Sequence, residues 1–213
     1  EAFGDTGANT LGHILKVRNG ILNMPNLAGL GLGEALNHSS GSPSPWHKPR
    51  NGGWAVAREI SKGKDTPSGH WELAGVPVPW DWHYFQNETP AFPVKIIRSV
   101  AEFAGGSLAN CHASGLAVID AFVDEHLRTG FPICYTSVDS VFQIAAHENT
   151  FGLQRLYDLC SKMAPMLHAM KVGRVIARPF EGSAEQGFQR TLNRKDFSID
   201  PPSPTLCDWV SEA

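Results

Sequence analysis

The sequence has no apolar run near the roughly 20 residues that a membrane-spanning helix needs. Its longest apolar stretches, such as residues 172–177, have the length of a strand. Charged residues make up only 18% of the chain, against about 25% in an average globular protein, which argues against a disordered or coiled-coil protein. There is no basic excess either, because the formal net charge is −3. We therefore expect neither a membrane nor a nucleic acid as partner.

Cysteine is scarce, and its four copies form no C-x-x-C pair: Cys111, Cys134, Cys160 and Cys207. Two disulfides are one interpretation, but a chain of 213 residues buries enough apolar surface to fold without them. Free, buried thiols are the favoured interpretation. Together with the lack of an apolar leader segment, they lead us to expect a cytoplasmic protein.

The chain is rich in glycine and proline. Its pattern of apolar residues changes near residues 90–93. Before them, residues 1–89 show little periodicity beyond an apolar patch at 21–30 and a predicted helix at about 54–60. Beyond Pro93, apolar spacing predicts helices over 94–103, 116–128, 141–147, 153–170 and from 205. The helix at 116–128 has Ser114 as its N-cap and ends at Gly130, and Pro165 is expected to interrupt the helix at 153–170. Runs of β-forming residues predict strands at 108–111, 132–136 and 173–177. Strands that alternate with helices indicate an α/β fold.

The densest run of reactive side chains is residues 61–77, SKGKDTPSGHWELAGVP. It supplies cations for phosphate, glycines for close backbone approach, a hydroxyl, and acid, base or metal-binding groups: Lys62, Gly63, Lys64, Asp65, Thr66, Gly69, His70 and Glu72. It is not a phosphate-binding P-loop, which requires glycine where Arg58 stands. It fits S-x-x-K, but the S-D-N and K-T-G partner motifs of serine-acyl enzymes do not occur. From these residues alone, a solvent-exposed turn is an equal interpretation.

The same run, in the form GKDTPSGHWELAGVPV, resembles the phosphothreonine loop of phosphopentomutases, which are metal-dependent members of the alkaline phosphatase superfamily. The resemblance extends along most of the chain through GDTGANTLGHI, PNLAGLGLG, NCHASG, EHLRTG, ICYTSVDSVFQIAAHENTF, VGRVIARPF and RTLNRKD. It implies an alkaline-phosphatase-like α/β core followed by a smaller α/β cap domain. The implied limits are 1–92 for the partial core with the nucleophile loop, 93–200 for the cap and 201–213 for the return to the core.

The resemblance also implies an activity, the interconversion of ribose 1-phosphate and ribose 5-phosphate and of the deoxyribose pair. Thr66 would be the phosphorylated nucleophile, and a sugar bisphosphate the activator and intermediate. Substrate contacts carry over to YTSVDSV, GRVIA and RTLNR, at Ser137, Asp139, Val141, Arg174, Ile176, Arg190 and Arg194. Without the resemblance, Arg190 and Arg194 are also interpretable as a solvated i, i+4 pair, and Asp139 as the cap of a helix that starts near Val141.

Members of this family bind two Mn²⁺ ions, and Thr66 is the one implied ligand in this sequence. The aspartate and histidine ligands belong to motifs outside the matched stretches, and neither D-H-G nor G-H-R-x-D occurs in this chain. The matched stretches correspond to about the middle half of the family's length. We therefore expect a fragment that lacks mutase activity by itself. A stand-alone sugar-phosphate binding module is the alternative. Among the histidines, His70 is the candidate for a functional role, and His112 and His147 are expected to be structural.

Overall fold

The computed structural model describes residues 6–46, 51–63 and 65–213. The chain divides into two compact units, Glu1–Glu59 and Ile60–Ala213. The domain limits at residues 92 and 200 stay predictions. No helix in the described ranges is both long and apolar enough to cross a membrane.

The first unit contains three short helices: α1 (Thr10–Val17), α2 (Pro25–Leu30) and α3 (Leu32–Ser40). The Asn9 side chain caps α1 by accepting a hydrogen bond of 2.9 Å from the amide of Gly12. The predicted helix at 54–60 is wrong, because residues 52–60 have no regular structure. Two of its apolar side chains are largely exposed, Val56 at 44% and Ile60 at 72%, and short helices draw most of their stability from burying such side chains.

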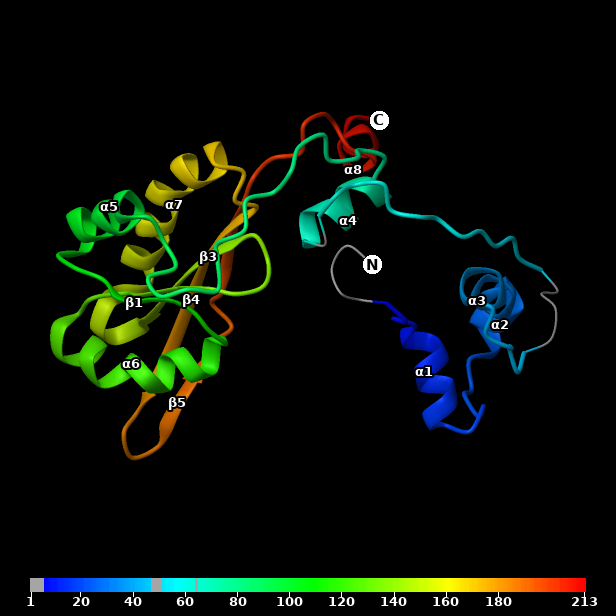
Figure 1. The fold of residues 1–213 in the computed structure, drawn as a ribbon, viewed down its shortest axis with the longest axis horizontal. Helices are drawn as coiled ribbons and strands as arrows, with labels where there is room; N and C mark the ends of the chain where they lie inside the picture. Colours follow the sequence, from blue (N-terminus) through cyan, green and yellow to red (C-terminus); the bar gives the residue numbers. More distant parts are fainter. Residues whose placement is uncertain (1–5, 47–50, 64) are drawn as a thin grey trace. The chain divides into compact units, whose positions relative to one another are not determined.

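The second unit is built on a six-stranded mixed sheet, shown in Figure 1. Its strands are β1 (Leu108–His112), β2 (Ile133–Thr136), β3 (Val141–His147), β4 (Arg174–Ser183), β5 (Gly187–Arg190) and β6 (Lys195–Ser198). The order is β1-β2-β3-β4-β5, and β6 also pairs with β4. The pairs β1–β2 and β3–β4 are parallel, and the other pairs are antiparallel. The expected α/β fold is confirmed.

Helices cover both faces of this sheet. One face carries α5 (Val94–Ala104) and α7 (Leu153–Ala169), and the other carries α6 (Gly115–Thr129) (Figure 1). The predicted limits of α5 and α6 are confirmed, as are Ser114 as N-cap and Gly130, at φ +71°, as C-cap. Residues of the central strands β2, β3 and β4 therefore divide between two separate apolar cores.

The segment at 141–147 is strand β3 rather than the predicted helix. Every one of its residues is buried, because helices cover both faces of the sheet. A strand buried on both faces has no polar alternation, so a short apolar run of this kind cannot be told from a helix by periodicity. The interpretation of Asp139 as a helix cap is wrong for the same reason.

The helix α7 is also continuous, contrary to the predicted interruption at Pro165. Proline removes one amide from the helix and frees the carbonyl four residues earlier, at Ser161. Both residues are exposed, so water can solvate the freed carbonyl.

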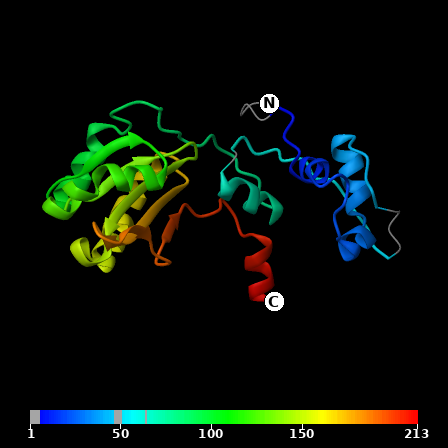
Figure 2. The same ribbon diagram turned by 90° about the horizontal axis from the view of Figure 1, so that it is seen from below.

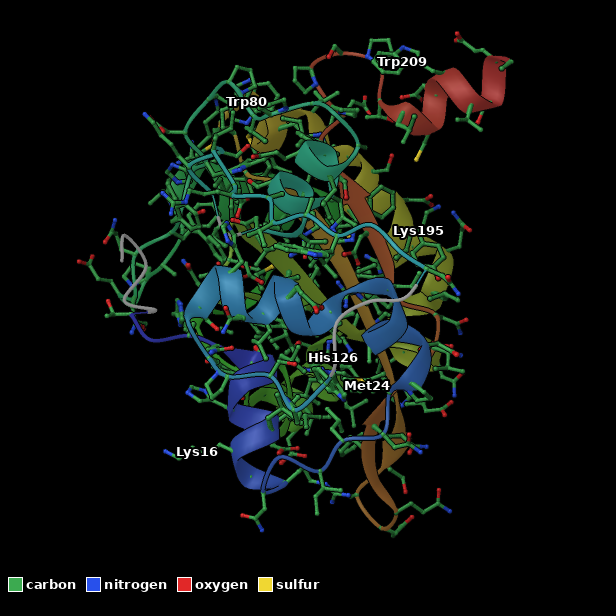
Figure 3. All side chains as sticks on the ribbon, turned by 90° about the vertical axis from the view of Figure 1, so that its right-hand side faces the viewer. Lys16, Met24, Trp80, His126, Lys195 and Trp209 are labelled. Atoms are coloured by element: carbon green, nitrogen blue, oxygen red, sulfur yellow. The ribbon has the colours of Figure 1, made fainter. Side chains whose placement is uncertain are left out.

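Two further helices of this unit, α4 (Thr66–Leu73) and α8 (Leu206–Glu212), lie away from the sheet (Figure 2). The amide of Leu206 donates a hydrogen bond of 2.9 Å to the carbonyl of Ala74, directly after α4. Figure 3 labels Trp80 and Trp209. The Lys171 ammonium lies over the Trp80 ring, 4.2 Å from its centroid. Trp209, on α8, is 54% exposed.

Candidate phosphate-binding site

Thr66 is the first residue of α4 and is exposed. Asp65 precedes it as the N-cap with extended backbone angles, and Pro67 follows in the first turn, where a missing amide costs no hydrogen bond. The hydroxyl of Thr66 thus sits at the positive end of a helix, which favours negative charge there by about 0.3–1 kcal/mol.

Asp65 is 2% exposed and joins the loop of Thr66 to the loop at 137–140. Its carboxylate accepts a hydrogen bond of 2.7 Å from the amide of Ser140. Burial raises the pKa of Asp65, and hydrogen bonds from the Tyr84 hydroxyl and the Ser140 amide oppose that rise.

The fully buried Ser140 fixes the C-terminal end of the loop at 137–140, directly before β3. The Ser140 hydroxyl donates to the carbonyl of His83 at 2.6 Å, and its carbonyl accepts from the amide of Gly173 at 3.0 Å. These bonds leave Ser137 and Asp139 at the exposed part of the loop, beside the start of β4.

Arg174, the first residue of β4, stands between two carboxylates. Its guanidinium lies 3.6 Å from Asp139 and 3.3 Å from Asp196, with only 10% of its side chain exposed. Arg194 donates twice to the same Asp196, at 2.6 Å each, and this pairing raises the pKa of Arg194. Arg194 stands in the turn before β6, and Arg190 ends β5, so the interpretation of these two residues as a helical i, i+4 pair is wrong.

A hydrogen-bonded row that the sequence reasoning missed runs along the same face of the sheet. Arg178 donates to Gln143 at 3.0 Å, and the Gln143 amide donates to Ser137 at 3.4 Å. The register pairs Val141 with Arg174 and Gln143 with Ile176, so alternate residues of β3 and β4 share this face. Period-two spacing would have found Arg178 and Gln143, had 141–147 been interpreted as a strand.

All eight sequence-predicted site residues line one cavity of about 280 Å³. This volume is just below the range of about 300–1,000 Å³ for ligand pockets, which suits a small ligand. The lining is Thr66, Ala113, Ser114, Gly115, Ser137, Asp139, Val141, Gln143, Arg174, Ile176, Arg178, Arg190 and Arg194. The charged residues of this lining are four arginines and one aspartate. The cavity is therefore locally cationic and attracts anions, although the whole chain has a net charge of −3.

Most other reactive residues of the 61–77 run have structural partners outside the cavity. Lys62 pairs with Asp81 at 3.2 Å on the surface. Glu72 accepts hydrogen bonds from the amides of Ile60 (2.6 Å) and Ser61 (2.8 Å), and hydrogen bonding with Ser61 and Ile60 lowers the pKa of Glu72.

The two glycines for which close backbone approach to a ligand is predicted, Gly63 and Gly69, are not among the residues that line the cavity. A Cβ atom at Gly63 would overlap the ring of Trp82, and Gly69 has open space around it. His70 contacts the carbonyl of Thr66 at 2.8 Å through Nδ1, but does not line the cavity. Lys64 lies outside the described residues.

The four cysteines and His147 are not among the residues that line the cavity. All four thiols are free, but only Cys134 and Cys160 are buried, while Cys111 is half-buried and Cys207 exposed. His147 is structural, as it accepts from the amide of Thr150 at 3.3 Å.

The described residues do not fit the two-manganese centre that the resemblance implies. Within residues 6–46, 51–63 and 65–213, no group of three or more histidine, cysteine, aspartate or glutamate side chains is arranged to hold a metal ion. The acid adjacent to Thr66 is Asp65, whose carboxylate is turned toward the Ser140 amide.

Comparison with known proteins finds relatives that align along the whole chain. No protein-family model matches it. Curated phosphopentomutases align with all of it: that of Aeromonas hydrophila is 51% identical over 225 residues, that of Pseudoalteromonas translucida 50% over 220, and that of Methylobacterium sp. (strain 4-46) 51% over 228. The chain spans 54–56% of the length of these relatives.

The mixed sheet with helices on both faces is an α/β fold, and the relatives belong to the alkaline-phosphatase-like superfamily. Identity near 50% along the entire chain narrows this class to one family. The chain belongs to the phosphopentomutase family.

Proposed function

We propose that this chain carries the phosphoryl-accepting threonine and the sugar-phosphate site of a phosphopentomutase. The enzyme interconverts ribose 1-phosphate with ribose 5-phosphate, and the corresponding deoxyribose phosphates. The observation that carries the proposal is that Thr66 and seven expected substrate contacts line the same small, cationic cavity. Cytoplasmic location, manganese dependence and a sugar bisphosphate activator are parts of the proposal that come from the family resemblance.

Accessibility supports Thr66 as the residue that carries the phosphoryl group. Thr66 is exposed and lines the cavity, whereas Ser68 is fully buried and its hydroxyl accepts a hydrogen bond of 2.6 Å from the Trp82 indole. Ser61 accepts from the amide of Val78 at 3.0 Å and lies outside the cavity lining.

The cavity wall supplies complementary groups for the rest of the substrate. The guanidinium groups of Arg174 and Arg190 present forked donors that match phosphate oxygens. Asp139 accepts hydrogen bonds from sugar hydroxyls. The apolar side chains of Val141 on β3 and Ile176 on β4, which line the same cavity, contact the carbon face of the pentose.

The transfer conserves atoms and charge in two half-reactions. In the first, the bond from phosphorus to the Thr66 Oγ breaks as a free hydroxyl of the sugar monophosphate forms a bond to the same phosphorus, and the hydroxyl proton passes to the Thr66 Oγ. The product is a sugar bisphosphate. After it reorients, Thr66 attacks its other phosphate and returns its own proton to the departing sugar oxygen. The arginines hold the charge of both phosphates throughout, so positioning and electrostatic stabilisation dominate the rate.

A chimera tests the proposal directly. This chain replaces the matched segment of the Aeromonas hydrophila phosphopentomutase, to which it is 51% identical. We expect the folded chimera to form ribose 5-phosphate from ribose 1-phosphate with Mn²⁺, and the Thr66→Val chimera to be inactive. A folded but inactive chimera, or an active Thr66→Val chimera, would contradict the proposal. In the inactive case, ribose 5-phosphate binding would favour a binding module without catalysis.

A further inference from the structure

The loop at 191–194 joins β5 to β6 and carries two arginines of the cavity wall at its ends. Arg190 precedes the loop as the last residue of β5, and Arg194 is the last residue of the loop itself. The apolar side chain of the loop, Leu192, is fully exposed. Because this side chain packs on nothing, the position of the loop depends on its polar contacts, and the positions of both arginines depend on the loop.

Glu148 forms such contacts from η1 (Glu148–Gly152), a π-helical turn directly after β3. Its Oε1 accepts hydrogen bonds from the Thr191 hydroxyl and, at 3.0 Å, from the side-chain amide of Asn193. The Thr191 hydroxyl also accepts a hydrogen bond of 3.3 Å from the main-chain amide of Asn193. One carboxylate oxygen therefore holds the chain neighbours of both arginines.

The turn η1 is a firm base for these contacts. His147, the residue before Glu148, is 7% exposed and accepts from the amide of Thr150 within η1 at 3.3 Å. The register places His147 beside Phe180 and Phe180 beside Arg190, so the sheet holds the start of η1 near the end of β5. π-Helical turns are rare and occur frequently at functional sites.

Tyr157 supplies a second tether of the loop, from α7. Its hydroxyl donates a hydrogen bond of 2.6 Å to the carbonyl of Asn193. Neither Glu148 nor Tyr157 is among the residues that line the cavity. Any effect of these two side chains on a bound sugar phosphate therefore passes through the loop.

We propose that Glu148 is a positioning residue, which holds Arg190 and Arg194 in the cavity wall by fixing the loop between β5 and β6. This inference rests on the proposed function, since it takes the two arginines as ligand contacts. A loop that adopts several positions presents its arginines correctly for only a fraction of the time, and the apparent affinity falls by that fraction. Glu148 thus favours the binding of an anion although it is itself negatively charged.

The sign of the effect distinguishes positioning from charge. If Glu148 acted only through its charge, Glu148→Ala and Glu148→Gln would both make the cavity more cationic and bind ribose 5-phosphate more tightly. As a positioning residue, Glu148 should give an alanine variant that binds at least about threefold more weakly, as for a loop placed correctly about a third of the time. Glu148→Gln keeps an acceptor oxygen for both donors and should bind at least as tightly as the unmodified chain. Equal weakening by both variants would overturn the inference.

Isothermal titration of the 213-residue chain with ribose 5-phosphate measures these affinities. Glu181→Ala is the matched control, because it removes the same charge from an exposed position on β4, outside the loop, and it should not weaken binding. Tyr157→Phe removes the second tether without a change of charge, so it should also weaken binding.

A double-variant cycle shows whether Glu148 acts through the arginines. If it does, Glu148→Ala combined with Arg194→Ala should lose less affinity than the product of the two single losses, because an absent arginine needs no positioning. The combination with Arg190→Ala should behave in the same way. Losses that multiply in full with both arginine variants would overturn the inference.

The outcomes separate this inference from the proposed function. If Glu148→Ala binds ribose 5-phosphate as tightly as the unmodified chain or more tightly, the positioning role is wrong and the proposed function stands. If Glu148→Ala binds more weakly and couples to the arginines while the chimera is inactive, the positioning role stands and the mutase proposal is wrong. If Glu148→Ala does not fold, Tyr157→Phe decides, and unchanged affinity of that variant overturns the inference. An unmodified chain that does not bind ribose 5-phosphate overturns it as well.

Discussion

The carboxylate of Asp65 accepts a hydrogen bond of 2.7 Å from the amide of Ser140, 75 residues later in the chain. This bond joins the residue before Thr66 to the loop that presents Ser137 and Asp139. The two walls of the cavity are therefore coupled by a buried contact, and the position of Thr66 relative to the expected substrate contacts depends on it.

Substituting Asp65 should disturb both stability and binding. Asp65→Ala leaves the buried Ser140 amide without an acceptor, so we expect its free energy of unfolding to fall by about 1–3 kcal/mol. Ribose 5-phosphate should also bind more weakly, because the two walls separate. Asp65→Asn keeps an acceptor oxygen and should retain most of both properties. Urea denaturation and calorimetric titration measure the two effects.

The matched control for Asp65 is Asp81→Ala, since the ion pair of Asp81 with Lys62 is on the surface. Exposed pairs contribute only about 0–1 kcal/mol, so little change is expected. An Asp65→Ala chain as stable as the Asp81→Ala chain and with full ribose 5-phosphate affinity would refute the coupling.

Arg194 should matter for binding and hardly for stability. Its side chain is 41% exposed, so Arg194→Ala should change the free energy of unfolding by less than about 1 kcal/mol. Ribose 5-phosphate affinity should fall at least about tenfold, the scale of a charge-assisted hydrogen bond. Arg128→Ala, which removes an exposed arginine paired with Glu125 at 3.5 Å, is the control. Equal affinities of the two variants would remove Arg194 from the site.

Metal dependence should differ between binding and turnover. Because the described residues hold no group of three metal-ligating side chains, ribose 5-phosphate affinity of this chain should be the same in Mn²⁺ and in EDTA. The isolated chain should form no ribose 5-phosphate from ribose 1-phosphate even with Mn²⁺. Turnover by the isolated chain would show that catalysis needs no ligands beyond those in this sequence.

Acid should destabilise the second unit through His126, labelled in Figure 3. This fully buried imidazole donates from Nδ1 to the carbonyl of Phe131 at 2.6 Å and accepts at Nε2 from the amide of His147 at 2.9 Å. Burial lowers the pKa of His126, and the neutral ring is the form that fits both bonds.

A lowered folded-state pKa means that the unfolded chain binds the proton more readily. The stability that the neutral His126 contributes is complete above the usual pKa of about 6.5 and is lost as pH falls below it, by at most about 1.4 kcal/mol per pH unit. Urea midpoints from pH 7.5 to 5 measure this slope, which His126→Gln should flatten. A variant with the same pH slope as the unmodified chain would exclude His126 as its source.

The helices that the sequence predicts correctly beyond Pro93 have one exposed face. The helix at 94–104 buries Ile96, Val100 and Ala104 along one face, and α6 has both a cap residue and a terminating glycine. The strand β3 was missed because both of its faces are buried, and that error hid Gln143 and Arg178, which depend on its register. Short strands such as β5, with exposed residues and no apolar run, gave no signal.

The site residues were predicted by family resemblance, because the groups that meet in the cavity are far apart in the sequence. Thr66 and Arg190 are brought together only by the sheet order and by buried tethers such as that of Asp65 to Ser140. Glu148 was not predicted, since a glutamate that follows an apolar run is indistinguishable from a solvated surface residue until the loop between Arg190 and Arg194 is seen bound to it.

The most direct test of the central claim is to locate the phosphoryl group. The chimera is incubated with Mn²⁺ and ribose 1,5-bisphosphate, digested, and mapped by tandem mass spectrometry. We predict phosphate on Thr66 of the peptide that contains residues 65–73. Phosphate on Ser61 or Ser68, with Thr66 unmodified, would contradict the account.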